Sequence, residues 1–109
     1  MGKATREAYG NALAKVGQQD THIIVLDSDL SKSTKTDTFK GACPERFFNV
    51  GIAEQNLISV GAGLAATDKK PFVSSFAMFA SGRAFEQIRN AVCYPKLNVK
   101  VCATHAGIT

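Results

Sequence analysis

With 109 residues, 45% of them hydrophobic and 20% charged, the chain has the size and composition of one globular domain and not of a disordered segment. Its net charge of +4 is interspersed along the sequence without the aromatic and basic interleaving of an RNA-binding surface, so we expect no nucleic-acid partner. The sequence contains neither an apolar run near the ~20 residues that span a bilayer nor a signal-peptide core, so we expect no membrane partner and a cytoplasmic location.

The cysteine and histidine content argues against a metal site. The three cysteines are an odd number without a Cys-x-x-Cys pair, and we expect them to be reduced and mostly buried. Only two histidines are present, and no potential ligands cluster along the sequence. We therefore expect this chain alone to hold no metal ion.

The first third of the chain predicts a helix, a strand and a polar loop. Apolar residues at helical spacing predict a helix over 5–16 that ends at Gly17. The β-branched run at 22–26 predicts a buried strand, followed by a turn at Asp27-Ser28-Asp29. Residues 31–41 are rich in Ser, Thr and Lys and are expected to form a loop, which is either simply solvated or attractive to a small anion.

The remaining two thirds alternate strands and helices. The predicted elements are a strand over 47–50, a helix over 52–66, a strand over 72–75, a helix over 78–94 and a strand over 97–103. In the helix over 78–94, we expect Phe85 to face the core and Arg83 to face solvent. Pro95 ends this helix.

Strands separated by helices of this length predict right-handed βαβ units. The expected fold class is therefore α/β, with a doubly wound, mostly parallel sheet and helices on both of its faces. In such sheets ligands bind outside the carboxyl ends of the strands. The polar segments that follow predicted strands are 27–29, 51–54, 75–76 and 104–105, so we expect the functional site along this edge.

The most informative segment is Val-Gly-Ile-Ala-Glu-Gln-Asn-Leu at 50–57. It puts one carboxylate, that of Glu54, at the start of a helix that is otherwise small and apolar. By spacing alone, such an acid favours a simple interaction with the helix dipole. Phe76 and Phe79, three residues apart after the third predicted strand, by spacing alone favour ordinary core positions.

Six segments together resemble the pyrimidine-binding domain of the transketolase family, over essentially the full length of the chain. They are Thr-Arg-Glu-Ala-Tyr-Gly at 5–10, Leu-Asp-Ser-Asp-Leu at 26–30, Gly-Ile-Ala-Glu-Gln-Asn at 51–56, Phe-Ala-Met-Phe at 76–79, Arg-Ala-Phe-Glu-Gln-Ile-Arg at 83–89 and Thr-His-Ala-Gly at 104–107. The Ile-Ala-Glu-Gln string is shared with 1-deoxyxylulose-5-phosphate synthases and related to the beta subunits of 2-oxoacid dehydrogenases. It therefore indicates thiamine-diphosphate enzymes in general, whereas the first and last segments favour transketolase.

The resemblance implies that the chain binds the aminopyrimidine ring of thiamine diphosphate. Glu54 would hydrogen-bond N1′ of the ring and favour the imino tautomer, which can accept the proton from C2 of the thiazolium. Phe76, and less directly Phe79, would stack on the aminopyrimidine. Asp29 and Leu30 would lie on the thiazolium side of the cofactor, although Asp29 also fits a simple turn former.

The same resemblance implies a substrate site. Arg6, Ser33 and His105 match positions that contact the phosphate and hydroxyl groups of a sugar phosphate. The residue types suit this role, because the guanidinium of arginine binds phosphate with a planar fork of donors. Considered singly, an exposed arginine and a structural histidine are the ordinary interpretations.

The glycine-aspartate-glycine motif that anchors the diphosphate and Mg²⁺ in these enzymes is absent from the sequence. The resemblance therefore implies that a diphosphate-binding partner domain or subunit holds Mg²⁺ and the other end of the cofactor, in a homodimer or, for a two-chain enzyme, in a heterotetramer. Residues 1–109 would be an incomplete pyrimidine-binding domain, truncated at Thr109. The assembled enzyme would transfer a two-carbon ketol unit between sugar phosphates, and the fragment alone would be inactive.

Other functions stay open at this point. A component resembling 1-deoxyxylulose-5-phosphate synthase or a 2-oxoacid dehydrogenase beta subunit would use the same cofactor chemistry. A non-catalytic, receiver-like module, with Asp27 or Asp29 as phosphoacceptor, belongs to a different class. A receiver would need neither Glu54 nor the phenylalanine pair, and its helix and strand spacing fits poorly.

Overall fold

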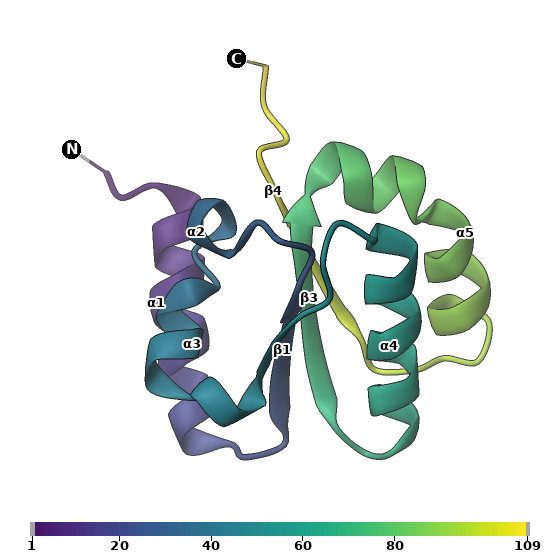
Figure 1. The fold of residues 1–109 in the computed structure, drawn as a ribbon, viewed down its shortest axis with the longest axis horizontal. Helices are drawn as coiled ribbons and strands as arrows, with labels where there is room; N and C mark the ends of the chain where they lie inside the picture. The colour runs from purple at the N-terminus through teal and green to yellow at the C-terminus, as the bar shows by residue number, and fades with distance from the viewer. Residues whose placement is uncertain (1, 109) are drawn as a thin grey trace.

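The computed structural model describes residues 2–108, so the expected truncation point, Thr109, lies outside it. Figure 1 shows the order of the elements in this range. The strands and the main helices are α1 (Thr5–Gln19), β1 (Ile23–Asp27), α3 (Asp37–Ala42), β2 (Phe47–Asn49), α4 (Glu54–Ala66), β3 (Lys70–Phe76) and β4 (Lys100–Thr104). The remaining elements are α2 (Ser31–Thr34), a 3₁₀ turn η1 (Pro44–Arg46), α5 (Phe85–Gln87) and the π-helical stretches η2 (Phe79–Arg83) and η3 (Ile88–Cys93).

Within residues 2–108, four strands form one sheet in the order β2-β1-β3-β4, and every neighbouring pair is parallel. The helices α1 and α3 cover one face of this sheet, and α4 with the α5 region covers the other (Figure 1). The predicted α/β class with a parallel sheet between two helical layers is confirmed. All carboxyl ends of the strands consequently lie at the same edge.

Strand β1 runs through the middle of the molecule and is buried over its whole length. Its side chains alternate between the two layers. Ile23 and Val25 pack with α1 and α3, whereas Ile24 and Leu26 pack with α4. This alternation sends the residues that follow Leu26 to opposite faces, which matters for the acids described below.

The expectation of a loop over 31–41 was wrong, because most of this segment forms the helices α2 and α3. The threonines Thr34 and Thr36 are fully buried and turn their hydroxyl groups inward to the carboxylate of Asp27. Phe39, also fully buried, fills the layer between α3 and the sheet. The polar composition of this segment therefore does not mean that all of it is solvated, because the hydroxyl groups of Thr34 and Thr36 are satisfied inside the protein.

Two further expectations about helices hold only in part. Helix α1 continues past Gly17 to Gln19, and Gly17 allows close packing instead of ending the helix, since a Cβ atom there would lie 2.3 Å from the Phe39 ring. The expected helix over 78–94 contains π turns, in which the amide of Ala84 bonds the carbonyl of Phe79 five residues earlier. Such turns shift the helical faces, so Phe85 is 62% exposed.

The remaining observations concern the cysteines and the membrane. All three cysteines are free, and Cys43 is buried while Cys93 is exposed, so the expectation of mostly buried thiols was wrong for Cys93. Across residues 2–108, none of the helices has the length and apolar character needed to cross a lipid bilayer.

Candidate functional site

Glu54 is the first residue of α4 and its side chain is almost completely buried, with 2% of its surface exposed. The chain reaches it through Gly51, whose φ of +81° is a left-handed conformation that suits glycine. The Oε1 atom accepts a hydrogen bond of 2.8 Å from Nη1 of Arg83, and Oε2 accepts one of 3.1 Å from the hydroxyl of Ser28. The carboxylate is therefore held from two sides at the carboxyl edge of the sheet.

The electrostatics keep Glu54 ionised. Burial alone raises the pKa of this carboxyl, but the hydrogen bonds from Arg83 and Ser28 and the positive charge of Arg83 outweigh it. The net result is a pKa below its ordinary value. Glu54 is thus a buried anion that is paired with one cation, an arrangement that goes beyond a simple interaction with the helix dipole.

Phe76 is the last residue of β3 and Phe79 the first of η2, and Arg83 connects the second of them to Glu54. Their rings are stacked with centroids 5.9 Å apart and planes inclined by 21°, and both side chains are half-buried at the edge of the sheet. The guanidinium carbon of Arg83 lies 4.8 Å from the centroid of the Phe79 ring, and the His105 ring lies 4.2 Å from that of Phe76. The aromatic pair therefore does not occupy ordinary core positions, and it connects Glu54 with the end of β4.

Asp27 is the second buried carboxylate of this edge and is fully inaccessible. It accepts hydrogen bonds from the amide of Leu30 at 2.6 Å and from the hydroxyls of Thr34 and Thr36 at 2.6 and 2.9 Å. Burial raises its pKa, and these hydrogen bonds oppose that effect only in part. Its contacts are those of a residue that fastens α2 and α3 to the sheet.

Asp29 is exposed and adopts a left-handed conformation with φ of +66°. Its amide donates to Oδ1 of Asn49 at 2.9 Å, and its carboxylate accepts from Nδ2 of the same asparagine at 3.1 Å. The same Oδ1 atom also accepts from the amide of Gly51 at 3.0 Å. Asn49 thus joins the turn after β1 to the turn that leads into α4.

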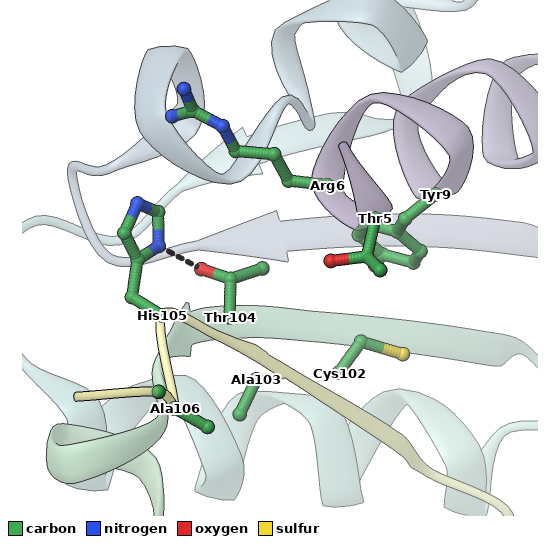
Figure 2. A pocket seen from close by; sticks show the side chains of 9 residues that line it. Thr5, Arg6, Tyr9, Cys102, Ala103, Thr104, His105 and Ala106 are labelled. Carbon is green, nitrogen blue, oxygen red and sulfur yellow. Dashed lines mark hydrogen bonds between the residues drawn. The ribbon is translucent and has the colours of Figure 1, made fainter. Parts of the chain in front are cut away.

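A cavity of about 390 Å³ lies next to this site, between the first turns of α1 and the end of β4. Figure 2 shows Arg6 and Tyr9 on the α1 side and Thr104 and His105 on the β4 side. Nη1 of Arg6 donates to the backbone carbonyl of Ser33 at 3.1 Å, and Nδ1 of His105 lies 2.7 Å from the hydroxyl oxygen of Thr104. Arg6 and His105 therefore line one cavity, and Arg6 ties it to α2.

The other predicted positions lie around a smaller cavity of about 180 Å³, which Asp29, Leu30 and Ser33 line together with their neighbours. The structure thus gathers all eight predicted site residues along one edge of the sheet. Their contacts with a cofactor or a substrate stay predictions.

Sequence reasoning missed Arg83, Ser28 and Asn49. Ser28 follows the alternation of β1, which directs it toward α4, so the pattern contained a usable signal. Its hydroxyl also lies 3.1 Å from that of Ser75, which extends the polar contact of Glu54 to β3. Arg83 is exposed as expected, with 52% of its side chain accessible, but the helical spacing gives no sign that its Nη1 atom reaches Glu54.

The donor set suits one end of a cofactor. A buried carboxylate next to aromatic faces fits a flat ring with N–H donors, and the planar guanidinium of Arg83 already makes both contacts. By contrast, no group of three or more His, Cys, Asp or Glu side chains in the range 2–108 is arranged to hold a metal ion. The residues therefore fit the aminopyrimidine end of thiamine diphosphate and supply no ligand cluster for Mg²⁺.

Comparisons with known proteins find relatives that match almost the whole of this chain. The chain is 60% identical over 107 residues to a protein of Methanocaldococcus jannaschii called putative transketolase C-terminal section, covering 98% of this chain and 34% of the relative. It is 46% identical to transketolase of Mus musculus, covering 97% of this chain and 17% of that protein. A solved structure described as a split gene transketolase, inactive beta4 tetramer, superposes with a TM-score of 0.88 at 67% identity, covering 96% of this chain and 35% of the other.

The chain thus spans about a third of the length of the archaeal relative and of the solved structure, and less of the mouse enzyme. The family described as transketolase, pyrimidine binding domain, matches residues 1–109, which is the whole sequence. The buried acid, the aromatic pair and the parallel sheet that positions them therefore belong to a member of the transketolase pyrimidine-binding domain family.

Proposed function

We propose that this domain is the pyrimidine-binding part of a transketolase, in which Glu54 activates the aminopyrimidine of thiamine diphosphate. One observation carries the proposal: a buried, ionised carboxylate lies at the carboxyl edge of the sheet and is connected through Arg83 to a stacked pair of phenylalanines. When bound, thiamine diphosphate supplies an acidic carbon atom that can carry a two-carbon ketol unit from one sugar phosphate to another.

Glu54 has the environment needed to hold a proton at N1′ of the pyrimidine. A charge-assisted hydrogen bond in a site shielded from water contributes about 1.5–3 kcal/mol. The hydroxyl of Ser28 binds Oε2 and so fixes the orientation of the carboxylate. The other oxygen, Oε1, binds Arg83, whose guanidinium lies over the Phe79 ring. An acid that must hold a proton at one defined atom needs a side chain with a fixed orientation, and these contacts provide it for Glu54.

Phe76 and Phe79 orient the ring and exclude water from it. An offset aromatic contact contributes about 0.5–1.5 kcal/mol in addition to the apolar area that it buries. Asp29 and Leu30 line the smaller cavity on the other side of the turn after β1. There a negative charge and an apolar side chain would face the cationic thiazolium ring.

The larger cavity is proposed to receive the phosphorylated end of the sugar. Arg6 and His105 line it from opposite elements, and Arg6 is oriented by the carbonyl of Ser33. Guanidinium and imidazole N–H groups are suitable donors for phosphate and hydroxyl oxygens. Sugar phosphates as substrates are also consistent with the proposed cytoplasmic location.

The diphosphate of the cofactor and its Mg²⁺ are proposed to be bound by a partner domain or subunit, in a homodimer or a heterotetramer. Two observations support this: the described residues offer no metal-ligand cluster, and the relatives that the chain matches are about three or more times as long. The chain alone is therefore proposed to be inactive.

Reconstitution tests the proposal. The domain, within its full-length protein, is combined with the partner that carries the glycine-aspartate-glycine motif, thiamine diphosphate and Mg²⁺. Ketol transfer between two sugar phosphates is the expected activity. Product formation only from pyruvate and glyceraldehyde phosphate would instead assign the chain to the 1-deoxyxylulose-5-phosphate synthase reaction, and no thiamine-dependent turnover with either pair would reject the proposed chemistry.

A further inference from the structure

Arg83 makes two contacts at the site that no other side chain in the range 2–108 combines. Its Nη1 atom donates to Oε1 of Glu54 at 2.8 Å, and its guanidinium carbon lies 4.8 Å from the centroid of the Phe79 ring. Its backbone carbonyl accepts a hydrogen bond of 3.2 Å from the side chain of Gln55, which ties the start of α4 to the end of η2. The guanidinium is a flat cation with N–H donors, and so is a pyrimidine ring protonated at N1′.

The space around the aromatic pair admits either the guanidinium of Arg83 or a pyrimidine ring, but not both. The rings of Phe76 and Phe79 are 5.9 Å apart, whereas a third ring between them would need about 7 Å, or twice an ordinary contact distance. A ring that stacks on Phe79 within hydrogen-bonding distance of Glu54 must therefore take the place of the guanidinium. The face of Phe76 that meets His105 gives no such route, since it is covered at 4.2 Å.

We propose that Arg83 is a positioning residue that holds the place of the aminopyrimidine ring until the cofactor binds. This inference rests on the proposed function, because it takes the ring of thiamine diphosphate as the ligand. Before binding, Arg83 pairs with a carboxylate that would otherwise be buried and unpaired, a costly state. On binding, the ring takes over the contact with Glu54 and the face of Phe79, and the arginine moves into solvent.

The two partners differ in a way that suits this exchange. The Glu54 side chain is 2% exposed and fixed by Ser28, whereas the Arg83 side chain is 52% exposed and long. Only Arg83 can leave without moving the backbone, and its guanidinium is readily solvated. The cofactor must therefore compete with an internal cation, and its affinity is lower than the contacts of Glu54 and Phe79 alone would give.

The test measures binding of thiamine diphosphate with Mg²⁺ to the assembled enzyme by isothermal titration calorimetry. Arg83→Met removes the competing cation and keeps an apolar side chain over the Phe79 ring. We expect the Kd to fall about threefold to tenfold, because one half-exposed ion pair no longer has to be broken. Arg83→Lys keeps a cation for Glu54 and should stay within about twofold of the wild type.

Arg89→Met is the matched control, because it removes the same charge from an exposed position in the neighbouring η3 stretch. Its Kd should be unchanged. Unchanged or weaker binding by Arg83→Met would overturn the inference, since removal of an arginine that merely supports Glu54 would weaken binding. Equally tighter binding by Arg89→Met would also overturn it. Turnover of Glu54→Gln, measured on the same assembly, tests the proposed function separately, and a wild-type assembly that binds no thiamine diphosphate would overturn both.

Discussion

Asp27 and Glu54 are two buried carboxylates at the same edge of the sheet, and their surroundings shift their pKa values in opposite directions. Asp27 is fully inaccessible and Glu54 is 2% exposed. Both accept hydrogen bonds from hydroxyl groups, but the pKa of Asp27 is raised and that of Glu54 is lowered. The number of hydrogen bonds does not explain this, because Asp27 accepts three from neutral donors.

The difference lies in the kind of donor and in its freedom to leave. The donors to Asp27 are neutral, belong to residues within nine positions in the sequence, and are themselves buried or half-buried. Glu54 is paired with the cation of Arg83, which is 29 positions away and half-exposed. Asp27 thus stabilises a fixed turn, whereas Glu54 stays an anion that is balanced by one half-exposed cation.

The largest expected effect concerns catalysis. Glu54→Gln in the assembled enzyme should lower kcat roughly 10²-fold to 10⁴-fold, the usual contribution of a positioned acid or base. The fold should survive, because the carbonyl oxygen of glutamine can still accept from Arg83 and its amide NH2 can donate to the hydroxyl oxygen of Ser28. Steady-state kinetics with sugar phosphates measure the effect, and Glu86→Gln, at an exposed position in α5, should leave kcat near that of the wild type. Near-normal turnover of Glu54→Gln would remove the contrast with Asp27.

The second prediction concerns stability on the Asp27 side. Asp27→Ala leaves the hydroxyls of Thr34 and Thr36 buried without their acceptor, so the free energy of unfolding should fall by about 2–4 kcal/mol. Urea denaturation of the full-length protein measures this. Asp37→Ala, at an exposed position at the start of α3, should change it by at most about 0.5 kcal/mol. A similar loss in both variants would show that Asp27 does not fasten α2 and α3.

A third prediction concerns the cavity between α1 and β4, where the positive charge of Arg6 is proposed to bind the substrate and not the cofactor. Arg6→Ala should raise KM about tenfold for phosphorylated sugars, since one charge-assisted bond is lost, and much less for unphosphorylated ones. Kinetics with both kinds of donor decide this, with Lys15→Ala on the exposed side of α1 as the control. Equal losses on both donors would argue against a phosphate contact.

The smallest effect is the pH dependence of stability. The folded pKa of Glu54 lies below its ordinary value of 4.5, so its contribution is complete above that value and is lost as the pH falls through the folded pKa. The folded pKa of Asp27 lies above its ordinary value of 3.8, so its contribution is complete below that value and is lost as the pH rises through the folded pKa.

Urea midpoints of the wild type, Glu54→Gln and Asp27→Asn between pH 3 and pH 7 therefore check whether the two acids really differ. On acidification, the stability advantage of the wild type over Glu54→Gln should shrink, and its advantage over Asp27→Asn should grow. Changes of the same sign in both comparisons would contradict the assigned charge states.

Much of the fold follows from local patterns. The apolar run of β1 predicts a buried strand because only a strand of a central parallel sheet is covered on both faces. The helical spacing after Glu54 predicts α4, although the helix begins two residues later than expected. With all strands parallel, the edge that carries the site follows from the order of the elements alone.

The sequence by itself determined the parallel sheet, the edge at which the polar segments meet and the position of Glu54 at a helix start, because these depend on the periods of neighbouring residues. Only the tertiary structure decided that Asp27 is structural while Glu54 stays charged. That outcome depends on which donors reach each acid: the inward-facing hydroxyls of Thr34 and Thr36 for one, and an arginine at the end of the π-helical stretch η2 for the other. Such contacts come from the packing of distant segments, which no local period encodes.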